Sequence, residues 1–264
     1  MALKTPIINI MTKAAYKAGN ILIKDFREVE NLQVSKKGIG DFVTSADLNS
    51  EKTIIKILQK AYPEIKILSE ETYSKTNLNE HEKKWIIDPL DGTLNFLHGL
   101  PHFAISIALM YKQEIVSGVI YDPIKDELFW SEKGMGSFVN NTRIRVSSRK
   151  KLRECMIITG GPKFNSKNKD LNFSEYKKIS NYLHSPIRKM GSATLDMAYV
   201  AAGRADGFFQ RNLNYWDIAA GIIIVKEAGG MIADYSGKSN YVNTGNIVAT
   251  NSFINRDLID LINS

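Results

Sequence analysis

The chain has 264 residues, 44% of them hydrophobic, so it is long enough to bury a large core as one domain or as two packed halves. Lysine and arginine (35) outnumber aspartate and glutamate (28), and the net charge of +7 favours anionic partners, although lysines on solvated faces explain the same excess. The single cysteine excludes an intrachain disulfide and fits a reducing compartment, and no apolar run approaches the roughly 18 residues that span a bilayer.

The N-terminal segment predicts an amphipathic helix that ends near Glu28, because its lysines are spread among apolar residues at helical spacing. It lacks the separate basic and hydrophobic blocks of a secretion signal, so we expect a cytoplasmic protein with no membrane segment. Residues 31–47 predict a hairpin that leads to a loop. Ser45 is the predicted N-cap of the next helix, which Pro63 terminates and whose first turn contains Asp47.

Two apolar runs end in acidic residues. The predicted strand of residues 65–68 leads through a serine to Glu70, and the apolar residues 85–87 lead directly to Asp88. Pro89 is expected to stop the second strand, and Asp91 follows within one turn. Asp88 and Asp91 would therefore point into one small volume, where their charges repel.

A hard divalent cation is the natural partner of such a pair, because Mg²⁺ prefers carboxylate, carbonyl and water oxygens. The carbonyl of Leu90 lies between the two side chains in the sequence. Gly92 allows close approach of a ligand, and Thr93 supplies a hydroxyl and an amide at a possible helix start. The alternative is a simple hairpin turn, since Asp-Gly between apolar runs is a strong hairpin signal.

The two halves of the chain differ in pattern. Residues 103–146 predict an antiparallel meander, which makes residues 1–146 an α+β half that contains the metal-binding motifs. Residues 147–264 alternate strands and helices, including a strand at 186–191, and make an α/β half that completes a site between the halves. There Asp217 begins an almost wholly apolar helix. Capping explains Asp217 by itself, but several acids near one cleft indicate a metal cluster.

Five segments occur together in this order. They are DFVTSAD (residues 41–47), SEE (69–71), WIIDPLDGTLNF (85–96), GSATLDMAYVAAGRADGFF (191–209) and WDIAAGIIIVKEAGG (216–230). Together they resemble the inositol monophosphatase family of Mg²⁺-dependent, lithium-sensitive sugar-phosphate phosphatases, which is related to the fructose bisphosphatases. The likeness covers essentially the whole chain and is strongest to the bacterial inositol-1-monophosphatase branch. It implies a layered αβαβα sandwich, of mixed α+β and α/β class, and a homodimer.

The resemblance also implies roles for single residues. The metal ligands would be Glu70, Asp88, the Leu90 carbonyl, Asp91 and Asp217, holding two to three Mg²⁺ ions. The catalytic residues would be Glu70, which holds the nucleophilic water, and Asp47 with Thr93, which accept its proton. Substrate contacts would come from Asp91, Gly92, Thr93, Gly191, Ser192, Ala193, Gln210 and Asp217. Lys36 lies near the family's active-site lysine, although the adjacent Lys37 leaves the register open.

Gln210 departs from the family pattern, which commonly has a glutamate that binds inositol hydroxyls. Glutamine keeps an acceptor but loses the charge, so hydroxyl recognition should weaken or shift. Inositol 1-phosphate is the first expected substrate. Fructose 1,6-bisphosphate, 3′-phosphoadenosine nucleotides and histidinol phosphate are the alternatives.

Six basic residues lie between positions 143 and 153: Arg143, Arg145, Arg149, Lys150, Lys151 and Arg153. A solvated strand end explains them, and a patch for nucleic acid or an acidic protein is the alternative. A regulatory or RNA-associated role with secondary phosphatase activity is therefore the competing hypothesis. The two hypotheses are compatible, because the basic stretch and the acidic cluster use different residues.

Overall fold

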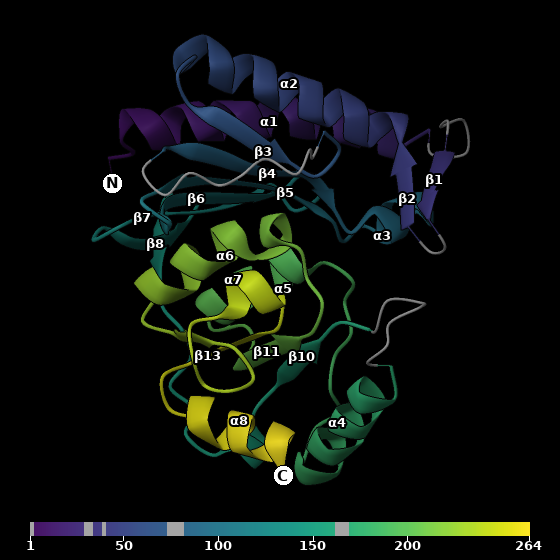
Figure 1. Ribbon diagram of the computed structural model, residues 1–264, viewed down its shortest axis with the longest axis vertical. Helices are drawn as coiled ribbons and strands as arrows, with labels where there is room; N and C mark the ends of the chain where they lie inside the picture. The colour runs from purple at the N-terminus through teal and green to yellow at the C-terminus, as the bar shows by residue number, and fades with distance from the viewer. Residues whose placement is uncertain (1–2, 29–33, 39–40, 73–81, 162–168) are drawn as a thin grey trace.

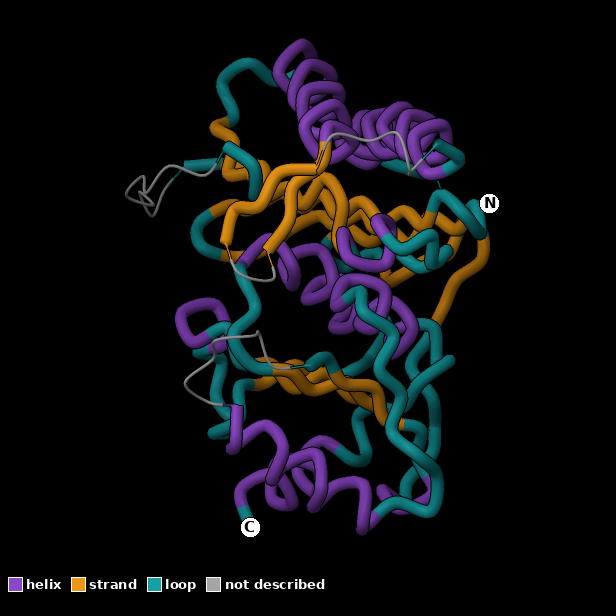
Figure 2. Tube along the Cα trace, turned by 90° about the vertical axis from the view of Figure 1, so that its right-hand side faces the viewer, coloured by secondary structure: helices purple, strands orange, loops and turns teal. Residues whose placement is uncertain are grey.

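The computed structural model describes residues 3–28, 34–38, 41–72, 82–161 and 169–264, without the side chains of residues 34–38, 41–43 and 169. Five layers follow one another from top to bottom in Figure 1, and the view in Figure 2 separates the two sheets with helices between them. The order is helices α1 and α2, a seven-stranded sheet, helices α5 and α6, a four-stranded sheet, and helices α4 and α8. The predicted αβαβα sandwich is confirmed.

The outer helices of the first layer are α1 (Pro6–Phe26) and α2 (Ser45–Ala61), which pack on each other. The predicted N-terminal helix is thus confirmed. The N-cap of α2 is Thr44 and not Ser45, because the Thr44 hydroxyl accepts the Ala46 and Asp47 amides at 3.1 and 3.2 Å. The Asp47 carboxylate accepts the Thr44 amide in return at 2.8 Å. This reciprocal capping box fixes the Asp47 side chain at the start of the helix.

The large sheet has the strand order β3-β4-β5-β6-β7-β8-β9. Its members are β3 (Lys66–Ser69), β4 (Lys84–Asp91), β5 (Ala104–Tyr111), β6 (Glu114–Asp122), β7 (Glu127–Glu132), β8 (Gly136–Val139) and β9 (Thr142–Ile144). Strands β3 and β4 are parallel, and every later neighbour is antiparallel. The predicted meander is confirmed. A separate hairpin, β1 (Val34–Gly38) with β2 (Asp41–Thr44), precedes α2, as the sequence predicts.

Pro89 does not end its strand, which corrects the prediction. Strand β4 continues to Asp91, but its register against β5 shifts: Asp88 opposes Ser106, and Asp91 opposes Ala104. Three steps along β4 therefore match two along β5, which is a β-bulge. A bulge accommodates a residue that has no amide to donate to the ladder.

The small sheet has the order β10-β11-β13-β12, formed by Ile157–Thr159, Gly207–Gln210, Ile247–Thr250 and Met231–Ala233. Strands β10 and β11 are parallel, and the other pairs are antiparallel. The strand predicted at 186–191 is only one bridge, between Ile158 and Arg188. Helices α4 (Lys169–Tyr182) and α8 (Asn255–Asn263) form the outer layer, and the short α7 (Tyr241–Thr244) was not predicted.

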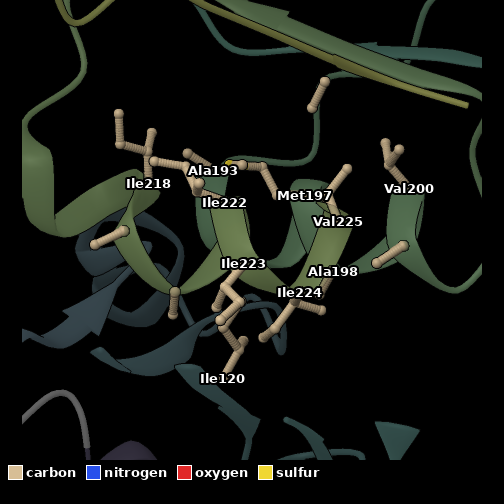
Figure 3. Close-up of a cluster of buried hydrophobic side chains, with 14 of the residues drawn as sticks. Ile120, Ala193, Met197, Ala198, Val200, Ile218, Ile222, Ile223, Ile224 and Val225 are labelled. Atoms are coloured by element: carbon tan, nitrogen blue, oxygen red, sulfur yellow. The ribbon is translucent and has the colours of Figure 1, made fainter. Parts of the chain in front are cut away.

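The middle layer consists of α5 (Ala193–Ala201) and α6 (Tyr215–Glu227), which the sequence predicts. Both are apolar on nearly all sides because sheets lie above and below them. Figure 3 shows Ile223 of α6 directed toward Ile120 of the large sheet. Gly118 makes this approach possible, since a Cβ there would lie 2.7 Å from Ile223 Cγ2. Helix α6, which lies in the second half of the chain, thus also contributes to the hydrophobic core under the large sheet of the first half.

The two sheets lie on either side of residue 146 in the chain, while the largest hydrophobic cluster contains residues from both sides. The division into 1–146 and 147–264 as separate domains stays a prediction. Within the described residues, no helix combines the length and apolarity needed to cross a membrane.

Candidate active site

Four elements bring polar groups to one cavity of about 670 Å³ that opens to solvent. Glu70 follows β3, Asp88 to Asp91 form the end of β4, Asp217 lies in the first turn of α6, and Ser192 caps α5. The cavity is lined by Glu70, Asp88, Leu90, Asp91, Gly92, Thr93, Gly160, Gly161, Gly191, Ser192, Ala193, Asp196, Gln210, Leu213, Asn214 and Asp217.

Every residue predicted to bind metal or substrate lines this cavity. Asp47 is not in its wall. Its Oδ1 atom lies 3.3 Å from the hydroxyl of Thr93, which does line it. The lysine that the resemblance points to, Lys36, has a side chain outside the described residues.

Asp88 is a buried acid of the cavity whose pKa is strongly perturbed. It is 1% exposed, and its Oδ1 accepts the Leu90 amide at 3.1 Å. Burial, followed by the negative charges of Glu70, Asp91 and Asp217, raises the pKa of Asp88 well above its usual value. The three charges act on Asp88 because they share its cavity, although Glu70 and Asp217 come from distant parts of the sequence.

Asp91 is held by the N-cap and first turn of α5. Its Oδ2 accepts the Ser192 hydroxyl at 2.6 Å and the Thr194 amide at 2.7 Å. Burial raises the pKa of Asp91, although these hydrogen bonds oppose the rise. The Asp217 Oδ2 atom accepts the Asn214 amide at 2.7 Å, so capping accounts for part of its placement.

The donor set of this cavity fits a hard cation. No lysine or arginine is among the described residues that line it, whereas five acids do: Glu70, Asp88, Asp91, Asp196 and Asp217. Carboxylate oxygens and one backbone carbonyl are the ligands that Mg²⁺ prefers. In the described part of the chain, no three acidic, histidine or cysteine side chains are already arranged as a metal-binding group. The case for a metal ion here therefore rests on three observations: the oxygen donors suit a hard cation, they line one cavity, and their negative charges repel one another.

Thr93 connects this acidic wall with Asp47. Its hydroxyl lies 3.0 Å from the Leu90 carbonyl oxygen and 3.3 Å from Asp47 Oδ1. Asp47 is buried and is fixed from the other side by Thr44. A hydroxyl between a carboxylate and the cavity can pass a proton from the cavity to that carboxylate.

The turn after β4 is not a hairpin, since helix α3 (Thr93–Leu97) begins directly after Gly92. Gly92 has φ 94°, and a Cβ there would lie 3.3 Å from the Gly191 carbonyl oxygen. Asn95 holds the same two loops together, because its amide donates to the carbonyls of His102 and Met190 at 2.8 Å each. The turn after β4 and the loop before α5 thus form one rigid edge of the cavity.

Sequence reasoning missed Asp196, Gly160, Gly161, Leu213 and Asn214 in this wall. Asp196 is 1% exposed, and neither carboxylate oxygen has a hydrogen-bond partner among the described residues. Burial, and then the charge of Asp91, raises the pKa of Asp196 well above its usual value. The sequence did contain a signal for Asp196, because it is the one charged residue in a helix whose other residues carry no charge.

Comparison with known proteins identifies the family. The model of the inositol monophosphatase family matches residues 3–264. The chain belongs to the inositol monophosphatase family. Membership makes it a phosphatase of the phosphoric monoester hydrolase class, as its motifs imply.

Among the relatives of this chain, inositol-1-monophosphatase of Rhizobium meliloti is 44% identical over 98% of this chain and 97% of its own length. Nus factor SuhB of Escherichia coli K12 is 43% identical over 93% of this chain and 91% of its own length. Among solved structures, extragenic suppressor protein SuhB from Bartonella henselae superimposes with a TM-score of 0.93, at 46% identity over 98% of both chains. Thermotoga maritima IMPase superimposes with a TM-score of 0.88 at 37% identity, and the match covers 98% of this chain and 97% of that chain.

Proposed function

We propose that this family member hydrolyses phosphate monoesters of small sugars and polyols, first of all inositol 1-phosphate, in a magnesium-dependent reaction. The observation on which the proposal rests is that Glu70, Asp88, Asp91 and Asp217 line one shared cavity. An acidic cavity repels a phosphate dianion unless cations are bound.

Glu70, Asp88, the Leu90 carbonyl, Asp91 and Asp217 would hold the ions, two to three per site. When bound, magnesium supplies positive charge for the phosphate oxygens and for the leaving alkoxide, and it lowers the pKa of water. The protein's own contribution is orientation. Asp91 and Asp217 are each fixed by backbone amides, so their carboxylates need no rearrangement before binding.

Glu70 would hold the attacking water, while Thr93 and Asp47 take its proton. The amides of Gly92 and Thr93 would bind phosphate, beside Asp91. Gly191, Ser192 and Ala193, with Gln210 and Asp217, would contact the sugar. The two loops that supply these groups are joined through Asn95, which supports a fixed spacing between the phosphate end and the sugar end.

The choice of inositol 1-phosphate is supported by relatives named inositol-1-monophosphatase at 44% identity. Phosphate release from inositol 1-phosphate should exceed release from fructose 1,6-bisphosphate, 3′-phosphoadenosine nucleotides and histidinol phosphate, and chelation of magnesium should abolish it. Asp91→Asn should release no phosphate while leaving the fold intact, because it removes one charge and almost no volume. Full turnover in that variant would defeat the proposal.

A second candidate function is regulatory binding to RNA or to an acidic protein, since relatives at 40–43% identity are named Nus factor SuhB. The structure commits part of the basic stretch to internal contacts. Arg149 donates to buried Asp206 at 3.0 Å, and Lys151 pairs with Glu154 at 3.1 Å. Lys150 lies over the Phe253 ring at 5.1 Å and is the better residue to neutralise.

Salt-sensitive RNA binding that is lost in Lys150→Ala with Lys151→Ala, at unchanged phosphatase rate, would support this second function. Absence of binding in low salt would remove it. A homodimer, inhibition by lithium and a cytoplasmic location are further expectations of the proposal, to be tested by sedimentation, by inhibition assay and by fractionation.

A further inference from the structure

A second, smaller cavity adjoins the catalytic one. It is open to solvent and lies between the ends of β10 and β11 and helix α4. Gly160, Gly161 and Gln210 line both cavities, so these three residues form the boundary between them. Whatever part of a substrate extends away from the acids on this side must pass that boundary.

At this boundary the side chain of Gln210 fills the space beside Gly160. A Cβ built on Gly160 would lie 2.0 Å from Gln210 Oε1 and 2.5 Å from Nε2. Gly160 is not among the described residues with positive φ, so its backbone does not require glycine. A larger residue at position 160 would displace the Gln210 amide, because the three atoms nearest to such a Cβ are all at the end of the Gln210 side chain.

The strand end that presents Gln210 is fixed from behind by α4. The neighbouring Arg211 donates from Nε to the carboxylate of Glu175 at 3.0 and 3.1 Å, and its Nη2 donates to the same group. The side chains of Glu175 and Arg211 are only 2% and 13% exposed, and the guanidinium lies 4.0 Å from the centre of the Tyr235 ring. Removal of one partner of such a buried pair leaves an uncompensated charge, so the pair holds β11 and α4 together.

We propose that Gly160 is a specificity-determining position that seats the Gln210 amide against the hydroxyl-bearing part of the substrate, with Glu175 and Arg211 as positioning residues. This inference rests on the proposed phosphatase function and adds the residues that would set its preference for esters of hydroxylated alcohols. A neutral amide offers a donor and an acceptor to a hydroxyl without adding another negative charge beside the phosphate site. A site built to hydrogen-bond a hydroxyl discriminates strongly against an analogue that lacks it.

The test compares kcat/KM for inositol 1-phosphate with kcat/KM for p-nitrophenyl phosphate, an ester whose alcohol has no ring hydroxyls. In Gly160→Ala the ratio of the two should fall about tenfold, the value of one hydrogen bond of roughly 1.4 kcal/mol. Glu127→Gln, in a partly exposed ion pair that lines neither cavity, is the control and should keep the ratio of the natural protein.

A double-mutant cycle with Gln210→Ala separates this role from a general disturbance. Once the amide is absent, Gly160→Ala should change the ratio by less than about twofold. An equal tenfold fall in both backgrounds, or in Glu127→Gln, would overturn the proposal. Lack of hydrolysis of either ester by the natural protein would instead refute the phosphatase function.

The positioning residues need a separate measurement. Glu175→Gln should raise KM for inositol 1-phosphate more than it lowers kcat, because the Gln210 amide becomes mobile while the acidic cavity is unchanged. Glu127→Gln breaks the more exposed pair of Glu127 with Arg204 and serves as the control. Equal effects of both variants on KM would show that Glu175 has only a general structural role.

Discussion

Replacement of Asp88 by asparagine should stabilise the metal-free protein and remove its response to magnesium. Asp88 is buried, and the charges of Glu70, Asp91 and Asp217 raise its pKa together with burial. A carboxyl whose pKa is raised on folding binds more protons in the folded state. Such a carboxyl therefore lowers the free energy of unfolding once the pH rises above its unfolded pKa, and this loss grows with pH until the folded pKa is passed. Asparagine keeps the volume and an oxygen for the Leu90 amide but removes that cost.

The expected gain in chelator is about 2 kcal/mol, at the low end of the penalty for an uncompensated buried charge. For a chain of this length, that corresponds to a rise in Tm of about 4–8 °C. With magnesium the order should reverse. A ligand present at about 100 times its Kd stabilises the folded state by roughly 2.7 kcal/mol, and Asp88→Asn should forfeit most of this gain.

The assay is thermal unfolding of both proteins in EDTA and across a magnesium titration, at pH 8. The equivalent substitution Asp257→Asn, on the first turn of α8 and far from the cavity in the fold, is the control for loss of one negative charge. If Asp88→Asn is less stable than the natural protein in EDTA, or responds equally to magnesium, then the acids do not repel one another as the structure indicates.

Three further outcomes follow from single side chains. Thr93→Val keeps the shape but removes the hydroxyl beside Asp47, so steady-state assays should show kcat reduced about 10²–10⁴-fold with little change in KM. His102 packs against the Tyr199 ring, and burial lowers its pKa to about 4, so the unfolded chain binds the proton first as pH falls. In urea unfolding, the free energy of unfolding of the natural protein should therefore fall between pH 6.5 and pH 4. His102→Phe should lose about 1–2 kcal/mol less over the same range, a figure reduced because His102 is partly exposed. Identical pH profiles of the two proteins would contradict this. Gly118→Ala places a Cβ 2.7 Å from Ile223 Cγ2 and should lower the free energy of unfolding by about 2 kcal/mol, whereas Gly161→Ala should leave it unchanged.

The sequence predicts the layers well, and it singles out acids that line one cavity, because both depend on local pattern. Apolar runs that end in Asp88 and Glu70 are readable as strands, and the family motifs fix their order. The errors arise where tertiary contacts decide. Pro89 remains in its strand only because β5 can pair around a bulge, and Thr44 rather than Ser45 caps α2 because Asp47 returns its hydrogen bond.

Gly160 and Asp196 were harder to predict from the sequence, because their roles depend on contacts with other segments of the chain. Gly160 shows no special spacing in the sequence, and its significance appears only when the Gln210 amide is found in its side-chain space. Asp196 was readable as the one charge in an apolar helix, but its place beside Asp91 depends on the packing of α5 against the end of β4. A local sequence pattern indicates that a segment must be buried or paired, but it does not indicate which distant segment it packs against.

The position of α6 in the middle layer has a consequence for biosynthesis. All strands of the large sheet have been translated by residue 144, yet the helix that covers its inner face is residues 215–227. A nascent chain therefore exposes apolar residues such as Ile120 and Phe129 while much of the second half is still being made. Chaperones that bind apolar strands should associate with ribosome-bound chains over this interval and dissociate once α6 has emerged.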